Sequence, residues 1–284
     1  MYHIFFAVAR VGCNFSLIFC KKLLHCPSFL CYNVFVEVSS PQPTLPTRKE
    51  GPVLNDFGYI KDNLRRVSLT IREAAERASR PLPRMVAVTK SATPEEVLAL
   101  VALGVSEIAE NRTALFRERW ELFDDEARPV MHLIGSLQTN KAKEVVGSAA
   151  LIQSVDRESL AREIQKRAAA KGISQEVLLE VNSGREEAKG GVLPEEAEAL
   201  AEMLVGLPNV RLSGVMTMGP VGVSEDALRL AFRETRELFD RLSERGLLGD
   251  APILSMGMSE SFPLAIEEGA TMVRIGRTLF ARKQ

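Results

Sequence analysis

The chain has 284 residues, of which 46% are apolar and 26% are charged, as is usual for a globular protein with one sizeable core or two small ones. Its formal net charge of -1 provides neither the basic field that gathers nucleic acid or an anionic membrane nor an acidic tail for a cationic partner. We therefore expect a protein that works on a small molecule and binds neither nucleic acid nor a membrane.

The cysteines are distributed unevenly along the chain. All four lie at its beginning, at Cys13, Cys20, Cys26 and Cys31, and none follows. A folded part without thiols suits a reducing cytoplasm, where structural disulfides are rare. The four cysteines also lack the closely spaced pairs that zinc sites use, so we expect no metal.

Residues 1–52 do not share the pattern of the remainder. Their apolar blocks are interrupted by charged residues and proline, and none reaches the roughly 18 apolar residues that a membrane-spanning helix needs. The segment also lacks the flanks and cleavage site of a signal peptide. We expect it to be disordered, or a non-native extension from an over-long reading frame, with the folded domain occupying residues 53–284.

A regular alternation of helix and strand patterns begins near Asp56. Apolar residues three and four positions apart between Phe57 and Ile71 predict an amphipathic leading helix, with Asp56 as its cap. Eight short apolar runs follow, each typical of a strand: Arg84–Thr89, Glu107–Ala109, Val130–Ile134, Leu151–Val155, Val177–Val181, Leu212–Met216, Ile253–Met256 and Met272–Ile275.

The segments between these runs carry helix-start signals. In Thr93–Glu96 a threonine cap precedes a proline and two acids, and other starts lie near Asp156, Pro194 and Ser224. Apolar strands that alternate with helices predict a parallel sheet covered on both faces. An open doubly wound sheet gives the same alternation, but eight strands and the motif positions favour a single (β/α)8 TIM barrel with a leading helix. No glycine-rich nucleotide-binding motif follows the first strand.

Polar residues just after each strand are the functional candidates, because the active sites of such barrels gather at the carboxyl ends of the strands. Lys90 closes the first strand. Either it extends its ammonium group into solvent, or partial desolvation at the barrel mouth favours the neutral amine that forms imines.

Asn111 and His132 belong to the next two strands. Asn111 follows the second strand and either caps the next helix or faces the barrel mouth. His132 lies within an apolar strand, where a hydrogen-bonded core histidine is more common than a ligand. It is the only histidine after residue 25, which leaves no partners for a metal cluster or a nucleophile–histidine–acid triad.

The last third of the chain carries an anion-binding pattern. Ser255–Ser259 follows the seventh strand, and Val273–Thr278 passes from the eighth strand into a helix. Barrels often bind phosphate between these two loops through backbone N–H groups, and Gly276 permits a close approach of the backbone. Each loop alone is explained by a glycine turn, but the two together favour a phosphate site.

Nine segments in this order resemble the pyridoxal phosphate homeostasis protein family, the YggS/PROSC group, from about Asp56 to the end of the chain. They are Val86–Lys90, Glu110–Arg112, His132–Gly135, Asn140–Lys141, Gln153–Asp156, Val181–Asn182, Gly214–Met218, Leu254–Ser259 and Val273–Gly276. The resemblance implies the barrel fold of the alanine racemase N-terminal domain and pyridoxal 5′-phosphate as the cofactor.

The resemblance also implies a role for each candidate site residue. Six residues would bind the cofactor: Lys90 as a covalent Schiff base, Asn111 in the pocket wall, Ser259, Gly276 and the backbone amide of Arg277 at the phosphate, and Arg274 at the pyridine nitrogen. An arginine beside that nitrogen keeps it unprotonated, which makes the ring a weak electron sink and argues against vigorous catalysis.

Three positions depart from the family pattern. Ala109 replaces a common glycine, Ser261 a frequent aspartate, and Arg277 a common threonine. The change at Arg277 removes a hydroxyl and adds a cation near the phosphate. These two effects on phosphate affinity oppose each other, so the sequence predicts a phosphate site but not how tightly it binds.

The resemblance implies a vitamin B6 protein of the cytoplasm, a monomer that takes part in cofactor homeostasis without substantial turnover and has PLP-dependent apoenzymes as potential partners. The first alternative is an amino-acid racemase on the same barrel. A racemase of this type takes its second base from a tyrosine of an added β domain, whereas about ten residues follow the last strand here and Tyr59 lies on the leading helix. The second alternative is a barrel that binds another phosphorylated metabolite, which leaves the position of Lys90 unexplained.

Overall fold

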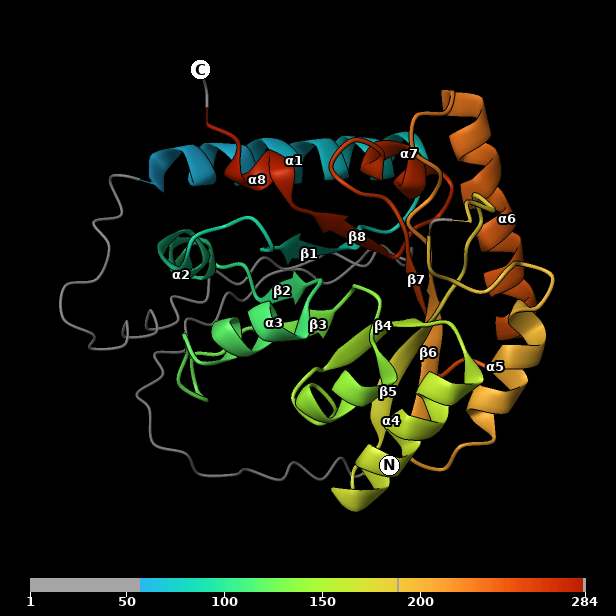
Figure 1. Cartoon of the computed structure of the whole chain (residues 1–284). Helices are drawn as coiled ribbons and strands as arrows, with labels where there is room; N and C mark the ends of the chain where they lie inside the picture. Colours follow the sequence, from blue (N-terminus) through green and yellow to red (C-terminus); the bar gives the residue numbers. More distant parts are fainter. Residues whose placement is uncertain (1–56, 188, 283–284) are drawn as a thin grey trace, which may run out of the picture. The chain divides into compact units, whose positions relative to one another are not determined.

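The computed structural model describes residues 57–187 and 189–282, in which eight strands alternate with helices (Figure 1). The segment 1–52 and the candidate cap Asp56 lie outside the described residues. The strands are β1 (Arg84–Val88), β2 (Glu107–Glu110), β3 (Val130–Leu133), β4 (Leu151–Val155), β5 (Gln175–Glu180), β6 (Val210–Met216), β7 (Ile253–Ser255) and β8 (Met272–Ile275). The helices are α1 (Gly58–Arg77), α2 (Pro94–Ala102), α3 (Thr113–Trp120), the 3-10 helix η2 (Thr139–Glu144), α4 (Glu158–Ala170), α5 (Ala197–Val205), α6 (Glu225–Glu244), α7 (Phe262–Glu267) and α8 (Arg277–Phe280).

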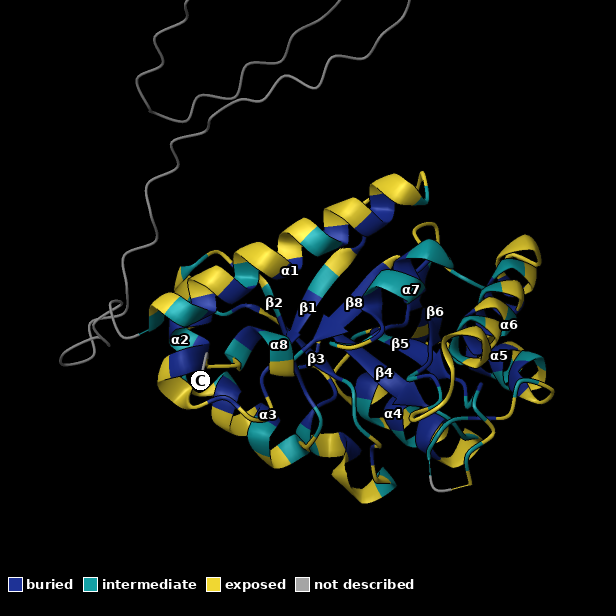
Figure 2. Cartoon of the chain, turned by 90° about the horizontal axis from the view of Figure 1, so that it is seen from above, coloured by how far each residue is buried: buried dark blue, intermediate teal, exposed yellow. Residues whose placement is uncertain are grey.

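The strands close into a parallel barrel in chain order. Each strand pairs with the next, and β8 pairs with β1 so that Val86 lies beside Arg274. The predicted barrel is confirmed and the open sheet is wrong. The strands are apolar along their length because both of their faces are buried. The helices cover the outer face, and the inner face lies in the barrel interior. Figure 2 shows most of their length in the colour of buried residues at the centre of the fold, with β1 beginning in the exposed and intermediate colours.

The strand boundaries agree closely with the apolar runs, and the clearest difference is at β5. This strand begins at Gln175 and not at Val177. Gln175 is polar but buried, because its amide donates to the carbonyl of Ala149 at 2.9 Å and accepts from the N–H of Gly147 at 3.0 Å. A pattern of apolar residues cannot reveal such a satisfied polar side chain.

Two helix starts form as predicted. At α2 the Thr93 hydroxyl accepts from the N–H of Glu96 at 3.3 Å, while the Glu96 carboxylate accepts from the N–H of Thr93 at 2.8 Å. At α6 the Ser224 hydroxyl accepts from the N–H of Ala227 at 3.3 Å. These side chains satisfy amide groups that the first helical turn leaves without partners.

Two other starts differ from the predictions. The first residue of α1 is Gly58, and Phe57 occupies the cap position without a side-chain hydrogen bond. The cap position of α4 is held by Arg157, which also makes no cap, so the prediction of a helix start near Asp156 is correct in place but Asp156 is not the cap. The Asp156 carboxylate instead accepts from the N–H of Gly191 at 3.4 Å.

The leading helix α1 packs on the outside of the barrel against α2, α7 and α8. Its Asn63 amide donates to the carbonyls of Leu279 and Ala281 at 3.0 and 2.8 Å. These bonds satisfy carbonyl groups at the end of α8 and so fix the segment that follows β8.

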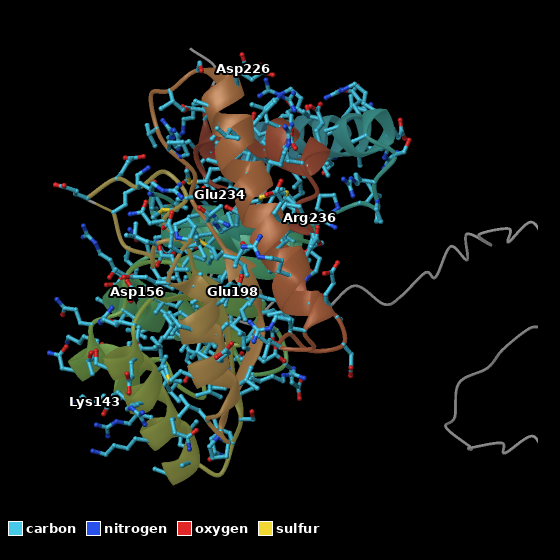
Figure 3. All side chains as sticks on the ribbon, turned by 90° about the vertical axis from the view of Figure 1, so that its right-hand side faces the viewer. Lys143, Asp156, Glu198, Asp226, Glu234 and Arg236 are labelled. Carbon is cyan, nitrogen blue, oxygen red and sulfur yellow. The ribbon has the colours of Figure 1, made fainter. Side chains whose placement is uncertain are left out.

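The outer faces of the helices carry dense ion pairs. Figure 3 shows Asp226, Glu234 and Arg236 along α6 and Glu198 on α5. Arg241 of α6 reaches Glu198 at 2.9 Å, and Arg245, which follows the helix, reaches it at 3.0 Å. Such exposed pairs contribute little to stability, typically about 0–1 kcal/mol each. None of the described helices combines the length and apolar character that crossing a bilayer requires.

Candidate functional site

One cavity of about 740 Å³ opens at the carboxyl ends of the strands. It is lined by all six predicted site residues: Lys90, Asn111, Ser259, Arg274, Gly276 and Arg277. They come from the loops after β1, β2 and β7, from β8 itself and from the start of α8. Ile134, Met218 and Leu228 add apolar wall. The closed parallel barrel brings these residues together because all its strands end on the same side.

Lys90 lies in the tight turn that follows β1. The N–H of Ala92 donates to the carbonyl of Thr89 at 3.0 Å, which closes the turn around the lysine. The side chain of Lys90 is exposed at the cavity. The expected partial desolvation of its amine is therefore not provided by the protein alone.

A buried ion pair holds the Lys90 turn from behind. The Arg119 guanidinium donates to the carbonyl of Ala92 at 2.6 Å and lies 3.4 Å from the Glu110 carboxylate. The same carboxylate accepts from the Thr89 hydroxyl at 2.6 Å. Burial raises the pKa of Glu110, against the lowering effects of the Thr89 bond and the Arg119 charge. We expect this cluster to fix the ends of β1 and β2. The pattern of apolar residues in the sequence did not predict it.

Asn111 lines the cavity and does not cap the next helix. Arg112 occupies the cap position of α3, which has no side-chain cap. The end of β2 packs tightly against Gly135 at the end of β3, where a Cβ atom would overlap the carbonyl oxygen of Asn111. The glycine of the His132–Gly135 segment is therefore required by this close approach.

The expected phosphate end is built from backbone amides. The N–H groups of Gly276 and Thr278 donate to the Ser259 hydroxyl at 3.2 and 3.5 Å. These donors point at one oxygen atom, the arrangement that a phosphate oxygen needs. A Cβ atom on Gly276 would lie 3.2 Å from the carbonyl oxygen of Val88, so a side chain there would press on β1. The Thr278 amide is a donor that sequence reasoning missed.

Arg277 and Arg274 differ in their surroundings. The Arg277 side chain is exposed and pairs with Glu260 at 2.8 Å, so its added charge is partly compensated. Arg274 is only 2% exposed and donates to the Ser255 hydroxyl at 2.6 Å and to the carbonyl of Thr217 at 2.8 Å. Burial lowers the pKa of Arg274 to about 10, opposed by Glu180, so the guanidinium remains charged at neutral pH.

Comparison with known proteins identifies the family to which this chain belongs. The family model "Alanine racemase, N-terminal domain" matches residues 63–283. A pyridoxal phosphate homeostasis protein of Aquifex aeolicus is 44% identical over 225 residues, which cover 78% of this chain and 98% of the relative. The chain belongs to the pyridoxal phosphate homeostasis protein family. A second member, from Pseudomonas aeruginosa, is 36% identical over 79% of this chain and 96% of its own length.

Two solved structures share the fold of this chain. PipY of Synechococcus elongatus with PLP bound is 30% identical, with a TM-score of 0.64, and the match covers 75% of this chain and 99% of PipY. An alanine racemase of Clostridium difficile in complex with cycloserine is 20% identical, with a TM-score of 0.64. That match covers 80% of this chain and 60% of the racemase, and it shows the fold alone.

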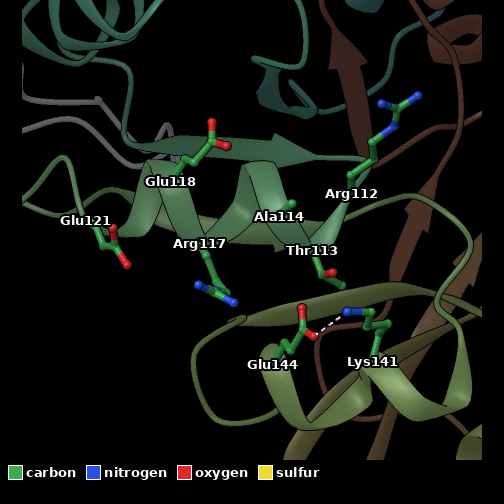
Figure 4. A pocket seen from close by; sticks show the side chains of 8 residues that line it. All are labelled: Arg112, Thr113, Ala114, Arg117, Glu118, Glu121, Lys141 and Glu144. Atoms are coloured by element: carbon green, nitrogen blue, oxygen red, sulfur yellow. Dashed lines mark hydrogen bonds and ion pairs between the residues drawn. The ribbon is translucent and has the colours of Figure 1, made fainter.

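A second hollow lies on the surface beside α3 and η2, with a volume of about 330 Å³ (Figure 4). It contains none of the six candidate residues. Three cationic and three anionic side chains line it, and Lys141 pairs with Glu144 at 2.8 Å. Figure 4 shows the Arg112 side chain directed away from this pair. The balanced charges give no field that would attract an anion or a cation, so the cavity at the barrel mouth remains the candidate site of this family member.

His132 lies in the core, as its strand position predicts. It is 1% exposed, and its Nδ1 lies 3.0 Å from the Gln153 amide nitrogen. Among the described residues, no group of three or more histidine, cysteine, aspartate or glutamate side chains is placed to hold a metal ion.

Proposed function

We propose that this chain binds pyridoxal 5′-phosphate at the barrel mouth and takes part in the intracellular homeostasis of that cofactor. The observation that carries the proposal is the meeting of six residues, predicted from scattered segments, in one cavity. Its volume of about 740 Å³ lies within the usual range for small-molecule sites. Membership of the homeostasis family and the PLP-bound PipY structure support the same cofactor.

The donor set of the cavity fits each part of the cofactor. The amides of Gly276 and Thr278 and the Ser259 hydroxyl would hold the phosphate, together with the backbone amide of Arg277. The Lys90 side chain would hold the aldehyde carbon of the cofactor as a Schiff base, with release of one water. When bound, the cofactor supplies an aldehyde for this bond and a pyridine ring as an electron sink.

We further propose that the protein carries the cofactor without substantial turnover. Arg274 would face the pyridine nitrogen and keep it unprotonated, which weakens the electron sink. Racemisation also needs a second base, which in the racemases is a tyrosine. Tyr59, the only tyrosine in the described part of the chain, bonds to Glu96 in the helix layer and does not line the cavity. The cytoplasm as location, a monomeric state and PLP-dependent apoenzymes as partners belong to the same proposal.

Borohydride reduction tests the covalent part of the proposal. After incubation with PLP and reduction, we expect one equivalent of cofactor fixed to the wild-type protein, because the exposed Lys90 amine faces the cavity. Peptide mapping should place the label on Lys90. A label on another lysine, or none, would contradict the assignment.

A racemisation assay tests the non-catalytic part. We expect L- or D-alanine mixed with the PLP-loaded protein to keep its optical rotation, because no lining residue described here supplies the tyrosine base. Alanine racemase at equal concentration is the positive control. Turnover of many equivalents per minute would favour the racemase alternative.

We also propose that residues 53–284 suffice for cofactor binding. The six lining residues all lie between Lys90 and Arg277, and the strands of the barrel begin at Arg84. A chain that starts at Val53 should keep a cooperative thermal transition and a PLP dissociation constant within about twofold of the full chain. Loss of either property would show that the first 52 residues contribute to the fold or the site.

A further inference from the structure

The interior of the barrel contains a row of polar side chains where branched apolar residues usually pack. Its members come from five strands and are Arg274 of β8, Ser255 of β7, Gln153 of β4, His132 of β3 and Glu107 of β2. The first four are at most 2% exposed. Buried polar groups are costly unless each has a partner, so such a row calls for an explanation.

The first four members of this row are joined by hydrogen bonds, and the last contact is a separation between two polar groups. The Arg274 Nη1 group is 2.6 Å from the Ser255 hydroxyl, which is 2.7 Å from Oε1 of Gln153. The Nε2 group of Gln153 is 3.0 Å from Nδ1 of His132. Nε2 of His132 is 3.4 Å from the Glu107 carboxylate, a contact that lacks hydrogen-bond geometry. The row therefore links the cavity to the residue that begins β2 at the opposite end of the barrel.

The first two bonds have one possible direction. A guanidinium only donates, so the Ser255 hydroxyl accepts from Arg274 and its own hydrogen is free to be donated. Oε1 of Gln153 is the acceptor for that hydrogen. If the amide were turned round, its NH2 group would face the hydroxyl, and the serine hydrogen would lose this acceptor.

The same amide orientation fixes the tautomer of His132. With Oε1 on Ser255, the Gln153 NH2 group faces two acceptors, Nδ1 of His132 and the sulfur of Met272 at 3.3 Å. Nδ1 must then be unprotonated. Burial lowers the pKa of His132 to about 4, so at neutral pH the ring carries one hydrogen, which lies on Nε2, 3.4 Å from the Glu107 carboxylate.

We propose that Ser255, Gln153 and His132 are positioning residues that fix the orientation of Arg274 through this directed row of hydrogen bonds. The inference rests on the proposed function, in which Arg274 faces the pyridine nitrogen. The bond from Arg274 to the carbonyl of Thr217 fixes one end of the guanidinium plane, and Ser255 fixes the other. At the far end Glu107 is held by Arg84 at 2.7 and 3.0 Å, so the row runs from a cation to an anchored anion.

The tautomer of His132 tests the row in the full chain without cofactor and without a change to any member of the row. Ring ¹⁵N chemical shifts should show the neutral form with its hydrogen on Nε2 between pH 6 and 8. The other two histidines, His3 and His25, are identified by replacing each with glutamine. A hydrogen on Nδ1, or a protonated ring in this range, would overturn the proposal whether or not the protein binds PLP.

Gln153→Met tests the effect on the cofactor, because methionine has similar length and lacks both the C=O acceptor and the NH2 donor of the amide. We expect about tenfold weaker PLP binding and a displaced visible band, as Ser255 loses its acceptor and Arg274 its fixed plane. The Lys90 label at saturating PLP should persist. The matched control is Ser154→Ala, which removes a buried hydroxyl from the neighbouring position on the other face of β4.

The outcomes separate this inference from the proposed function. If wild-type protein takes no label at Lys90, the proposed function fails, and the histidine tautomer still decides whether the row is directed as described. If wild-type protein binds PLP and Gln153→Met leaves both affinity and band unchanged, or Ser154→Ala changes them equally, the positioning role is wrong. Should Gln153→Met not fold, the tautomer measurement decides alone.

Discussion

Replacing Lys90 with alanine should abolish covalent labelling by PLP and borohydride while leaving a folded protein. Lys90 is exposed, so its removal leaves no buried cavity and no buried group without a partner. The phosphate donors at Ser259 and Gly276 do not depend on it. Since hydrogen bonds to a charged group contribute about 1.5–3 kcal/mol each, two of them would retain a dissociation constant on the order of 1 mM.

The measurements are mass spectrometry after reduction and calorimetric titration with PLP. The control is Lys166→Ala, an exposed lysine on α4 outside the cavity, which should label at Lys90 like the wild type. Stoichiometric labelling of the Lys90→Ala protein at another site would contradict the assignment. Complete loss of PLP binding would show that the phosphate donors need the lysine.

Glu180→Gln should stabilise the protein at alkaline pH relative to wild type. Glu180 ends β5, is 3% exposed, and its Oε2 atom has no hydrogen-bond partner among the described residues. Burial, reinforced by Asp156, raises the pKa of Glu180 from 4.5 to about 7, against the lowering effects of Arg274 and Arg157. The folded state therefore binds this proton more tightly than the unfolded state does.

The sign of the pH effect follows from this difference. The contribution of Glu180 to stability is fully present below pH 4.5 and is lost as the pH rises through 7, because ionisation then costs more in the folded state. At 1.36 kcal/mol per pH unit, the loss is about 3 kcal/mol. Glutamine cannot ionise, so the advantage of Glu180→Gln over wild type should grow by about this amount between pH 4.5 and 8.

Urea denaturation of both proteins at the two pH values measures this advantage. The lowered pKa of His132 makes the free energy of unfolding rise with pH between pH 4 and 6.5, opposite to the effect of Glu180. Both proteins contain His132, so this effect cancels in the comparison. Glu158→Gln, at an exposed position on α4, is the control. An advantage that stays constant within about 0.5 kcal/mol from pH 4.5 to 8 would show that Glu180 titrates normally.

The six candidate residues illustrate how much of the site could be predicted from the sequence. Lys90 and Asn111 directly follow apolar runs, and Gly276 lies between the eighth run and a helix. In a parallel barrel every strand ends on the same side, so position along the chain is enough to place such residues at one mouth. The roles at that mouth came from the family resemblance.

The sequence did not reveal the groups behind the cavity. Glu110 and Arg119 form an ion pair beneath the Lys90 turn. The helix that carries Arg119 has no clear apolar stripe, so its sequence does not indicate that Arg119 faces the barrel. Ser255 and Gln153 are 102 positions apart and meet only because β7 and β4 both point side chains into the barrel. Whether two such polar atoms come within hydrogen-bonding distance depends on the side-chain rotamers and on the position of each residue along the barrel axis. The periodicity of apolar residues predicts neither.

By itself, the sequence determined the eight strands, their burial on both faces and the residues at their carboxyl ends, because these follow from local apolar runs and from the short connections between them. Only the tertiary structure decided which polar side chains of the interior satisfy one another. It also decided that Asp156 does not cap α4 and that the pKa of Glu180 is raised. These properties depend on contacts between distant segments and on the water that the closed barrel excludes.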